Sequence, residues 1–109
     1  MGKRNGSWSK QELLLALALY ASFDPADRTR IPKAAICALA ANMPKTSESS
    51  IALRLANFAN RDPQVAALGK TGLRGGGTHV DELLNEASDP QGQIDLQKVL
   101  RLIALTVNV

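Results

Sequence analysis

The stretch SSIALRLANFANRDP, residues 49–63, decides the fold because it places an apolar and a polar stripe on one helix. At about 100° per residue the two stripes lie on separate sides. The apolar stripe consists of Ile51, Leu55 and Phe58, and the polar stripe consists of Ser50, Arg54, Asn57 and Arg61. The apolar stripe predicts packing against a core, whereas the polar stripe either binds a partner or simply faces water.

The residues around this stretch mark its ends and place another helix in front of it. Thr46 or Ser47 is suited to cap the helix, which should end near Asn60, before an Asp-Pro pair. A shorter helix over residues 32–42, with a proline in its first position, precedes a break at residues 43–45. Two helices around a tight break predict a helix-turn-helix pair, whose recognition helix covers about residues 47–61.

The first helix is predicted from a capping box. Ser9 is followed three residues later by Glu12, and Trp8 with Leu13 has the spacing of a hydrophobic staple, so a helix should begin at residue 10. The run LLLALALYASF is apolar nearly all round, which is typical of a central helix. An Asp-Pro pair closes this helix, and residues 24–31 are expected to form a charged loop.

A glycine-rich segment follows the third helix. Asp62 should cap, and Pro63 open, a single turn that stops at a left-handed Gly69. The next ten residues, GKTGLRGGGT (69–78), contain five glycines, which predicts a mobile or unusually shaped loop outside the packed elements. Two more helices are expected, one beginning at Thr78 and one over residues 95–106.

The fold class that follows is all-α, a compact bundle of about five helices that contains the helix-turn-helix-like pair. We expect a single domain over residues 1–109, because a chain of 109 residues is near the usual size of one domain. Residues 8–63 would form a three-helix core of DNA-binding type. The glycine-rich loop and the C-terminal helices would occupy residues 64–109.

The charge of the chain is mildly basic and unevenly distributed. Thirteen Lys and Arg stand against ten Asp and Glu, for a net charge of +3. Eleven of the cations precede residue 81, whereas half of the acidic residues lie within residues 81–95. The basic part is therefore the candidate nucleic-acid face. Within the glycine-rich loop, Lys70 and Arg74 could hold a backbone phosphate; the alternative is that the loop is merely a flexible connector.

Several classes of protein are excluded by what the sequence lacks. A membrane span needs about 18 apolar residues in a row, which no segment provides, so we expect no membrane contact and a cytoplasmic location. One cysteine, Cys37, permits no intrachain disulfide, and with the single His79 it cannot form a zinc site. His79 has no evident catalytic partner, and no phosphate-loop or dinucleotide motif is present. We therefore expect no enzyme, no cofactor and no metal.

The order of these segments resembles a known family. SWSKQELLLALALY, a short helix, SSIALRLANFANRDP and GLRGGG before VDELL are similar to the small N-terminal helical domain of many bacterial HNH-type restriction endonucleases, and the first part looks like the opening of Myb/SANT domains. The resemblance covers roughly residues 7–88. It implies a helix-turn-helix-like DNA-recognition accessory. A single histidine cannot provide an HNH centre, so the nuclease domain and its activity are not implied. The matching residues are Trp8, Glu12, Leu13, Leu17, Tyr20, Ala52, Arg54, Leu55, Asn57, Phe58, Asp62 and Pro63.

The function expected from the sequence is non-catalytic binding of double-stranded DNA, linked to restriction or transcriptional regulation in a bacterium or phage. The main contacts would be accessible Arg54, Asn57 and Arg61, pointing away from the core. The supporting contacts would be Lys45, Thr46, Ser47, Ser50, Lys70 and Arg74. The alternative is a protein-interaction module, such as a phage or mobile-element inhibitor of a host defence protein. The apolar C-terminal helix could close the core or form a homodimer seam.

Overall fold

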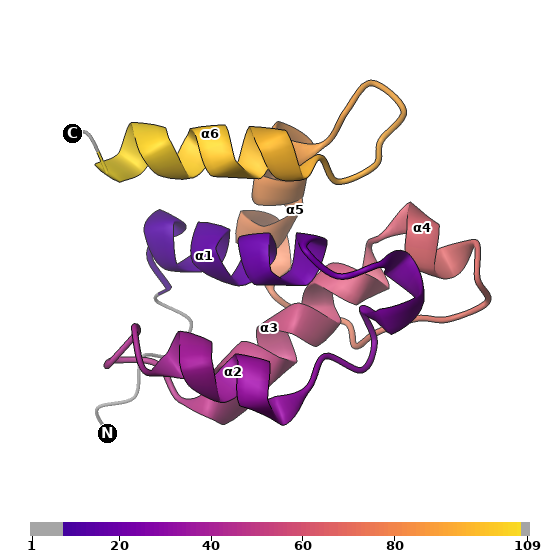
Figure 1. Ribbon diagram of the computed structural model, residues 1–109. Coiled ribbons are helices and arrows are strands. Elements are labelled where there is room, and N and C mark those ends of the chain that lie inside the picture. The colour runs from indigo at the N-terminus through magenta and orange to yellow at the C-terminus, as the bar shows by residue number, and fades with distance from the viewer. Residues whose placement is uncertain (1–7, 108–109) are drawn as a thin grey trace.

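The computed structural model describes residues 8–107, and these residues form an all-α fold, as predicted (Figure 1). No strand is present within this range, where Ser88 and Ile94 form one isolated bridge. None of the helices within it is long and apolar enough to cross a bilayer. The helices are α1 (Lys10–Ala21), α2 (Lys33–Ala40), α3 (Glu48–Asn60), α4 (Pro63–Ala66), α5 (Gly77–Ala87) and α6 (Leu96–Val107), with a 3-10 turn, η1, at Pro25–Asp27.

Helix α1 begins where the capping box predicts. The backbone N–H of Glu12 donates to Ser9 Oγ over 3.1 Å, and Glu12 Oε1 accepts from the backbone N–H of Ser9 over 2.9 Å. Two otherwise unpaired donors of the first turn are thereby satisfied. Trp8 packs against the hydrophobic core, which begins at the buried Leu13.

Helix α1 is the central element of the fold. Figure 1 shows α6 along one side of α1, α2 and α3 on the other, and α5 crossing behind. Large apolar side chains from four helices meet in one core, and burying each of them contributes about 1.5–3 kcal/mol. The largest of them are Leu14, Leu17, Tyr20, Ile51, Phe58, Val80 and Val99.

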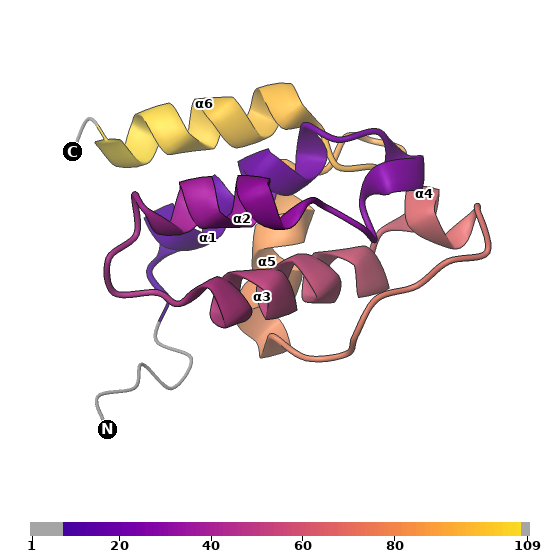
Figure 2. The same ribbon diagram turned by 60° about the horizontal axis from the view of Figure 1, so that its bottom comes forward.

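Helices α2 and α3 form the predicted pair, side by side in Figure 2. Helix α2 is shorter than predicted, because Pro32 is its N-cap and its last residue is Ala40. Met43, in the turn that follows, is buried in the core. Ser47 caps α3 by accepting from the backbone N–H of Ser50 over 3.1 Å. Asp62 caps α4 in the same way, and Gly69 has the predicted left-handed backbone.

A buried ionic network joins α1, η1 and the start of α4. Arg28 lies in the segment predicted as a charged loop, yet only 7% of its surface is exposed. Its Nη1 donates to Asp62 Oδ2 over 3.0 Å, and the Tyr20 hydroxyl donates to the same oxygen over 2.5 Å. The arginine also donates to the carbonyls of Phe23 and Ala21. Each buried charge thus has a partner, as burial requires.

Alkaline destabilisation should report on this network. Burial, and then the hydrogen bond to Asp62, raise the pKa of Tyr20 above the ordinary value of about 10. The stability that depends on the phenol proton is therefore complete below about pH 10 and decreases as the pH rises further. Urea unfolding from neutral pH to about pH 11 should show this decrease. The Tyr20→Phe variant should lose less stability over the same range, and an equal loss in both proteins would contradict the expectation.

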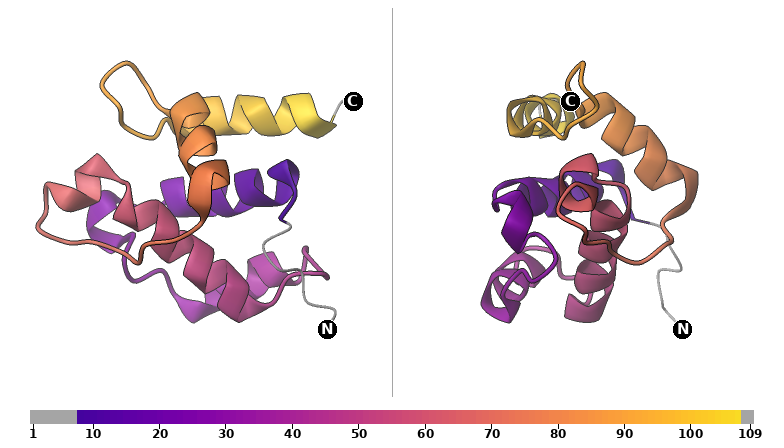
Figure 3. Two further views of the ribbon diagram at one scale, coloured as in Figure 1. Left: turned by 180° about the vertical axis from the view of Figure 1, so that it is seen from behind. Right: turned by 90° about the vertical axis from the view of Figure 1, so that its right-hand side faces the viewer.

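The glycine-rich segment is an unusually shaped loop, as predicted, with positive φ at Gly75, Gly76 and Gly77, but it contacts α3, which corrects the prediction that it lies apart from the packed elements. After α4 it turns back and runs beside α3 to the start of α5 (Figure 3). The N–H of Leu73 donates to the carbonyl of Ala56 over 3.1 Å. A Cβ on Gly72 would lie 2.0 Å from that same carbonyl oxygen and 2.8 Å from Ala59 Cβ. Gly72 therefore lets the two backbones approach more closely than any other residue would.

The outer side of α6 stays partly apolar. Leu100 and Leu105 are exposed, while Val99 on the same helix is fully buried. The homodimer seam suggested by the sequence remains a prediction.

Candidate functional site

The polar stripe of α3 does not face solvent along its whole length, so the prediction of three accessible contacts is wrong at Asn57. Asn57 is only 1% exposed. Its Nδ2 donates to the carbonyl of Leu73 over 2.9 Å, and its Oδ1 accepts from Arg54 Nη1 over 2.8 Å. The side chain that was expected to read a base instead fastens the glycine-rich segment to α3.

Arg54 is half-buried beside Asn57. Its guanidinium lies over the Trp8 ring, 5.2 Å from the centroid, as in a cation–π contact. Burial, and then the neighbouring charge of Arg61, lower the pKa of Arg54. Its Nε is buried and has no hydrogen-bond partner among residues 8–107. Gly76 also lies close to the Arg54 guanidinium, since a Cβ added to this glycine would be 3.0 Å from Arg54 Nη1.

Arg61 is held at the other end of the stripe by α5. Its Nε lies 2.6 Å from Asp81 Oδ1, and only 20% of its side chain is exposed. Its Nη1 donates to the carbonyl of Asn57 over 3.0 Å. The expected accessibility of Arg61 is therefore also reduced, because the arginine joins the C-terminal end of α3 to α5.

The supporting residues of the prediction do not form one surface. Thr46 is buried, which corrects its expected contact with DNA, and its hydroxyl lies 3.4 Å from Glu12 Oε2. Ser50 is half-buried against Ser47, 3.0 Å between hydroxyls. Lys70 is exposed, but its Nζ donates to the carbonyl of Ala26 over 3.1 Å. Lys45 and Arg74 are exposed and make no ion pair within the described part of the chain.

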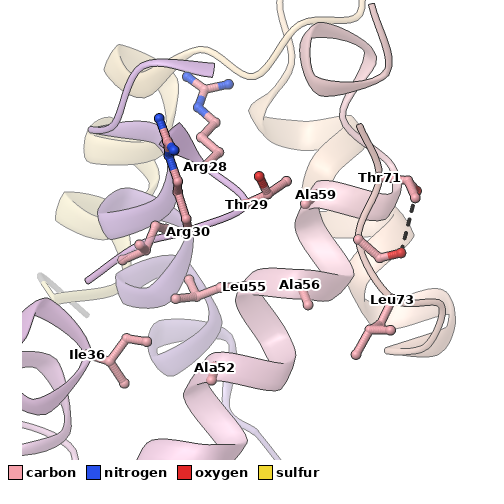
Figure 4. A pocket seen from close by; sticks show the side chains of 12 residues that line it. Arg28, Thr29, Arg30, Ile36, Ala52, Leu55, Ala56, Ala59, Thr71 and Leu73 are labelled. Atoms are coloured by element: carbon pink, nitrogen blue, oxygen red, sulfur yellow. Dashed lines mark hydrogen bonds between the residues drawn. The ribbon is translucent and has the colours of Figure 1, made fainter. Parts of the chain in front are cut away.

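The opposite side of α3 carries a groove that the sequence did not predict. Its volume is about 460 Å³. Figure 4 shows α3 as its floor from Ala59 to Ala52, with Arg30 and Ile36 on one side and Leu73 on the other. Leu55 and Ala59 are buried beneath it, whereas Leu73 is 58% exposed. The other residues that line the groove are Arg28, Thr29, Ile31, Ala56, Thr71 and Gly72.

The lining of the groove is mostly apolar and contains no carboxylate. The Arg28 guanidinium is compensated by Asp62, so it gives the groove little free charge. Arg30 is exposed and lies 3.3 Å from Asp27 in a surface pair. Leu53, 48% exposed, is not among the lining residues and lies on α3 beside the polar stripe. Such a surface can hold apolar side chains, and its lining contains no histidine, cysteine or carboxylate.

A sequence signal for this groove exists in retrospect. Ala52, Ala56 and Ala59 recur at the spacing of one helix face and leave room above the helix axis. Beside the stripe of Ile51, Leu55 and Phe58 they look like ordinary core positions. The glycine-rich segment makes them a floor, because Thr71, Gly72 and Leu73 form the second wall.

No cluster of metal-ligating side chains lies within residues 8–107, and His79 is exposed. Comparisons with models of known protein families, with curated proteins and with solved structures gave no match for this chain. The resemblance to the restriction-endonuclease domain therefore remains a prediction from the residues.

Proposed function

We propose that this protein is a non-catalytic interaction module that holds apolar side chains of a protein partner in the groove on α3. The observation that supports this proposal is the groove itself, with Leu73 exposed on its wall. An exposed leucine alone proves nothing, because many apolar side chains remain on protein surfaces. Here, however, Leu73 stands on the wall of a concave, mostly apolar lining, which is typical of interaction sites.

The size of the groove fits a few side chains of a partner. Binding sites for small molecules have volumes of about 300–1,000 Å³, and the groove falls within that range. The lining residues between Ala52 and Ala59 extend over about two helical turns, so a segment of polypeptide can lie along α3. Each large apolar side chain that becomes buried there contributes about 1.5–3 kcal/mol before the cost of ordering the partner.

Double-stranded DNA is the second candidate partner. Lys45, Lys70 and Arg74 are exposed, and the net charge of the chain is +3. The resemblance implies the same partner. Because Asn57 and Thr46 are buried, binding would rest on cations at backbone phosphates, and it would weaken steeply with salt.

The variant Ala52→Trp is expected to separate the two candidates. A tryptophan on the exposed floor residue Ala52 fills the groove without disturbing a buried side chain. Short peptides selected from a displayed random library for binding to the intact protein should lose at least about tenfold in affinity for this variant. The matched control is Ala104→Trp, at another exposed alanine, on α6, and this variant should bind the peptides unchanged. Fluorescence anisotropy with labelled peptides measures both affinities.

The same samples are tested with a labelled duplex of random sequence at low salt. A complex that survives Ala52→Trp but is lost in the Lys45→Ala, Arg74→Ala double variant would favour DNA over a protein partner. Selected peptides that bind the Ala52→Trp variant as tightly as the intact protein would contradict the proposed use of the groove. Circular dichroism shows that each variant retains its helices.

A further inference from the structure

We infer that the partner segment is acidic: it carries large apolar side chains flanked by Asp or Glu. This inference rests on the proposed function, because it names the chemistry of the segment that would occupy the same groove. It is drawn from the charges on both walls and from the absence of carboxylates in the lining.

The first wall is cationic at its edge. Arg30 lines the groove, and its side chain in the surface pair with Asp27 is 73% exposed. A surface pair of this kind is worth at most about 1 kcal/mol, so a partner carboxylate can share or replace Asp27. Lys33 is exposed on the first turn of α2, two residues after the lining residue Ile31.

The second wall is flanked by cations on both sides. Lys70 and Arg74 immediately precede and follow the lining residues 71–73, and both are exposed. Lys70 donates to the carbonyl of Ala26, which brings this wall next to η1 at the end of the groove that Arg28 lines. A carbonyl carries no net charge, and Lys70 makes no ion pair within residues 8–107, so its ammonium is uncompensated by them.

The balance around the groove is four cations against two carboxylates: Asp27, paired with Arg30, and Glu48, which lies beside Cys37 one helical turn before Ala52. The cations are Arg30, Lys33, Lys70 and Arg74. A basic segment would place its own cations next to these cations when its apolar side chains enter the groove. The resulting repulsion would weaken its binding. An acidic segment gains at both walls, and its attraction extends over about 8–10 Å at moderate salt.

The backbone of the second wall favours recognition through side chains. The N–H and the carbonyl of Leu73 are already paired with Ala56 and Asn57 of α3. The carbonyl of Gly72 lies 3.5 Å from Asn60 Nδ2. A partner therefore cannot pair with these groups as an added strand, so its affinity must come from apolar anchors and from charge.

The test is to read the composition of peptides selected from a displayed random library on the intact protein. Peptides that still bind Ala52→Trp are discarded, so that only those that need the groove remain. We expect these peptides to be rich in Asp and Glu next to large apolar residues. They should bind the Arg30→Glu, Arg74→Glu double variant about tenfold more weakly than the intact protein.

A matched control is the Lys45→Glu, Arg101→Glu double variant, which changes the net charge equally at exposed positions outside the groove. It should bind the peptides with nearly unchanged affinity. If groove-dependent peptides show no excess of acidic residues, or if both double variants weaken binding equally, the inference of an acidic partner is wrong while the proposed function stands. If no selected peptide needs the groove, both are wrong.

Discussion

Replacement of Asp62 by alanine is expected to lower the free energy of unfolding by about 3–5 kcal/mol, because it leaves a buried guanidinium without its counter-charge. Asp62 is 1% exposed and Arg28 is 7% exposed, so water cannot compensate either group in place. The same substitution removes the acceptor for the Tyr20 hydroxyl and the cap of α4, since Asp62 Oδ1 accepts from the backbone N–H of Gln64. Asp62→Ala therefore removes three stabilising interactions at once.

Urea unfolding followed by circular dichroism measures this effect. Asp62→Asn should cost less than Asp62→Ala, because asparagine can still cap α4 although it carries no charge for Arg28. The control is Asp27→Ala, which removes the carboxylate of an exposed ion pair and should change stability by no more than about 0.5 kcal/mol. A cost for Asp62→Ala as small as that of the control would show that the network contributes little.

Gly72→Ala is expected to cost about 1–3 kcal/mol or more, because the added methyl group has no space. Its Cβ would lie 2.0 Å from the backbone oxygen of Ala56, which cannot rotate away as a flexible side chain could. Relief requires the segment to move away from α3, which would lengthen the hydrogen bonds of Leu73 to Ala56 and Asn57. The groove would lose its second wall as a result.

The matched control is Gly69→Ala. Gly69 has a left-handed backbone with φ of 76° and nothing within 4 Å of an added Cβ, so its substitution costs only backbone strain of about 1 kcal/mol. Thermal unfolding should therefore rank Gly72→Ala as the more damaging substitution. Binding of groove-dependent peptides should decrease for Gly72→Ala alone. The opposite ranking would mean that the close approach to α3 is not required.

The starts of α1, α3 and α4 could be predicted because short-range chemistry determines them, whereas α2 is shorter than predicted and α5 begins at Gly77 without a side-chain cap. Ser9, Ser47 and Asp62 each accept a hydrogen bond from a backbone N–H two or three residues further along the chain, so the pattern is contained in a few letters. Gly69 ends its turn for an equally local reason. The central place of α1 was also predictable, since its apolar residues surround the whole helix.

The fate of the polar stripe could not be predicted, because its partners lie far along the chain. Asn57 pairs with Leu73, sixteen residues later, and Arg61 pairs with Asp81, twenty residues later. Amide and guanidinium groups that can hydrogen-bond to a nucleic-acid base can also hydrogen-bond to a protein carbonyl or carboxylate. Residue type alone therefore does not show which partner is used. Glycines carry no side chain, and nothing in their pattern indicates that the segment packs against a helix.

Arg28 and the groove were missed for related reasons. An arginine in a charged loop is usually exposed, and its burial depends on Asp62 being brought to the same place by α4. The alanines of the groove floor are small enough for either a core or a surface. Only the path of the glycine-rich segment distinguishes these cases, and that path is a property of the whole fold.

The position of that segment also determines which surface α3 can present. While residues 72–73 are paired with α3, the groove has two walls and Asn57 is occupied. If the segment separated from α3, Asn57 would become accessible and the groove would lose one wall in the same movement. A ligand that contacted the Asn57 side chain would therefore compete with any ligand that needs both walls of the groove.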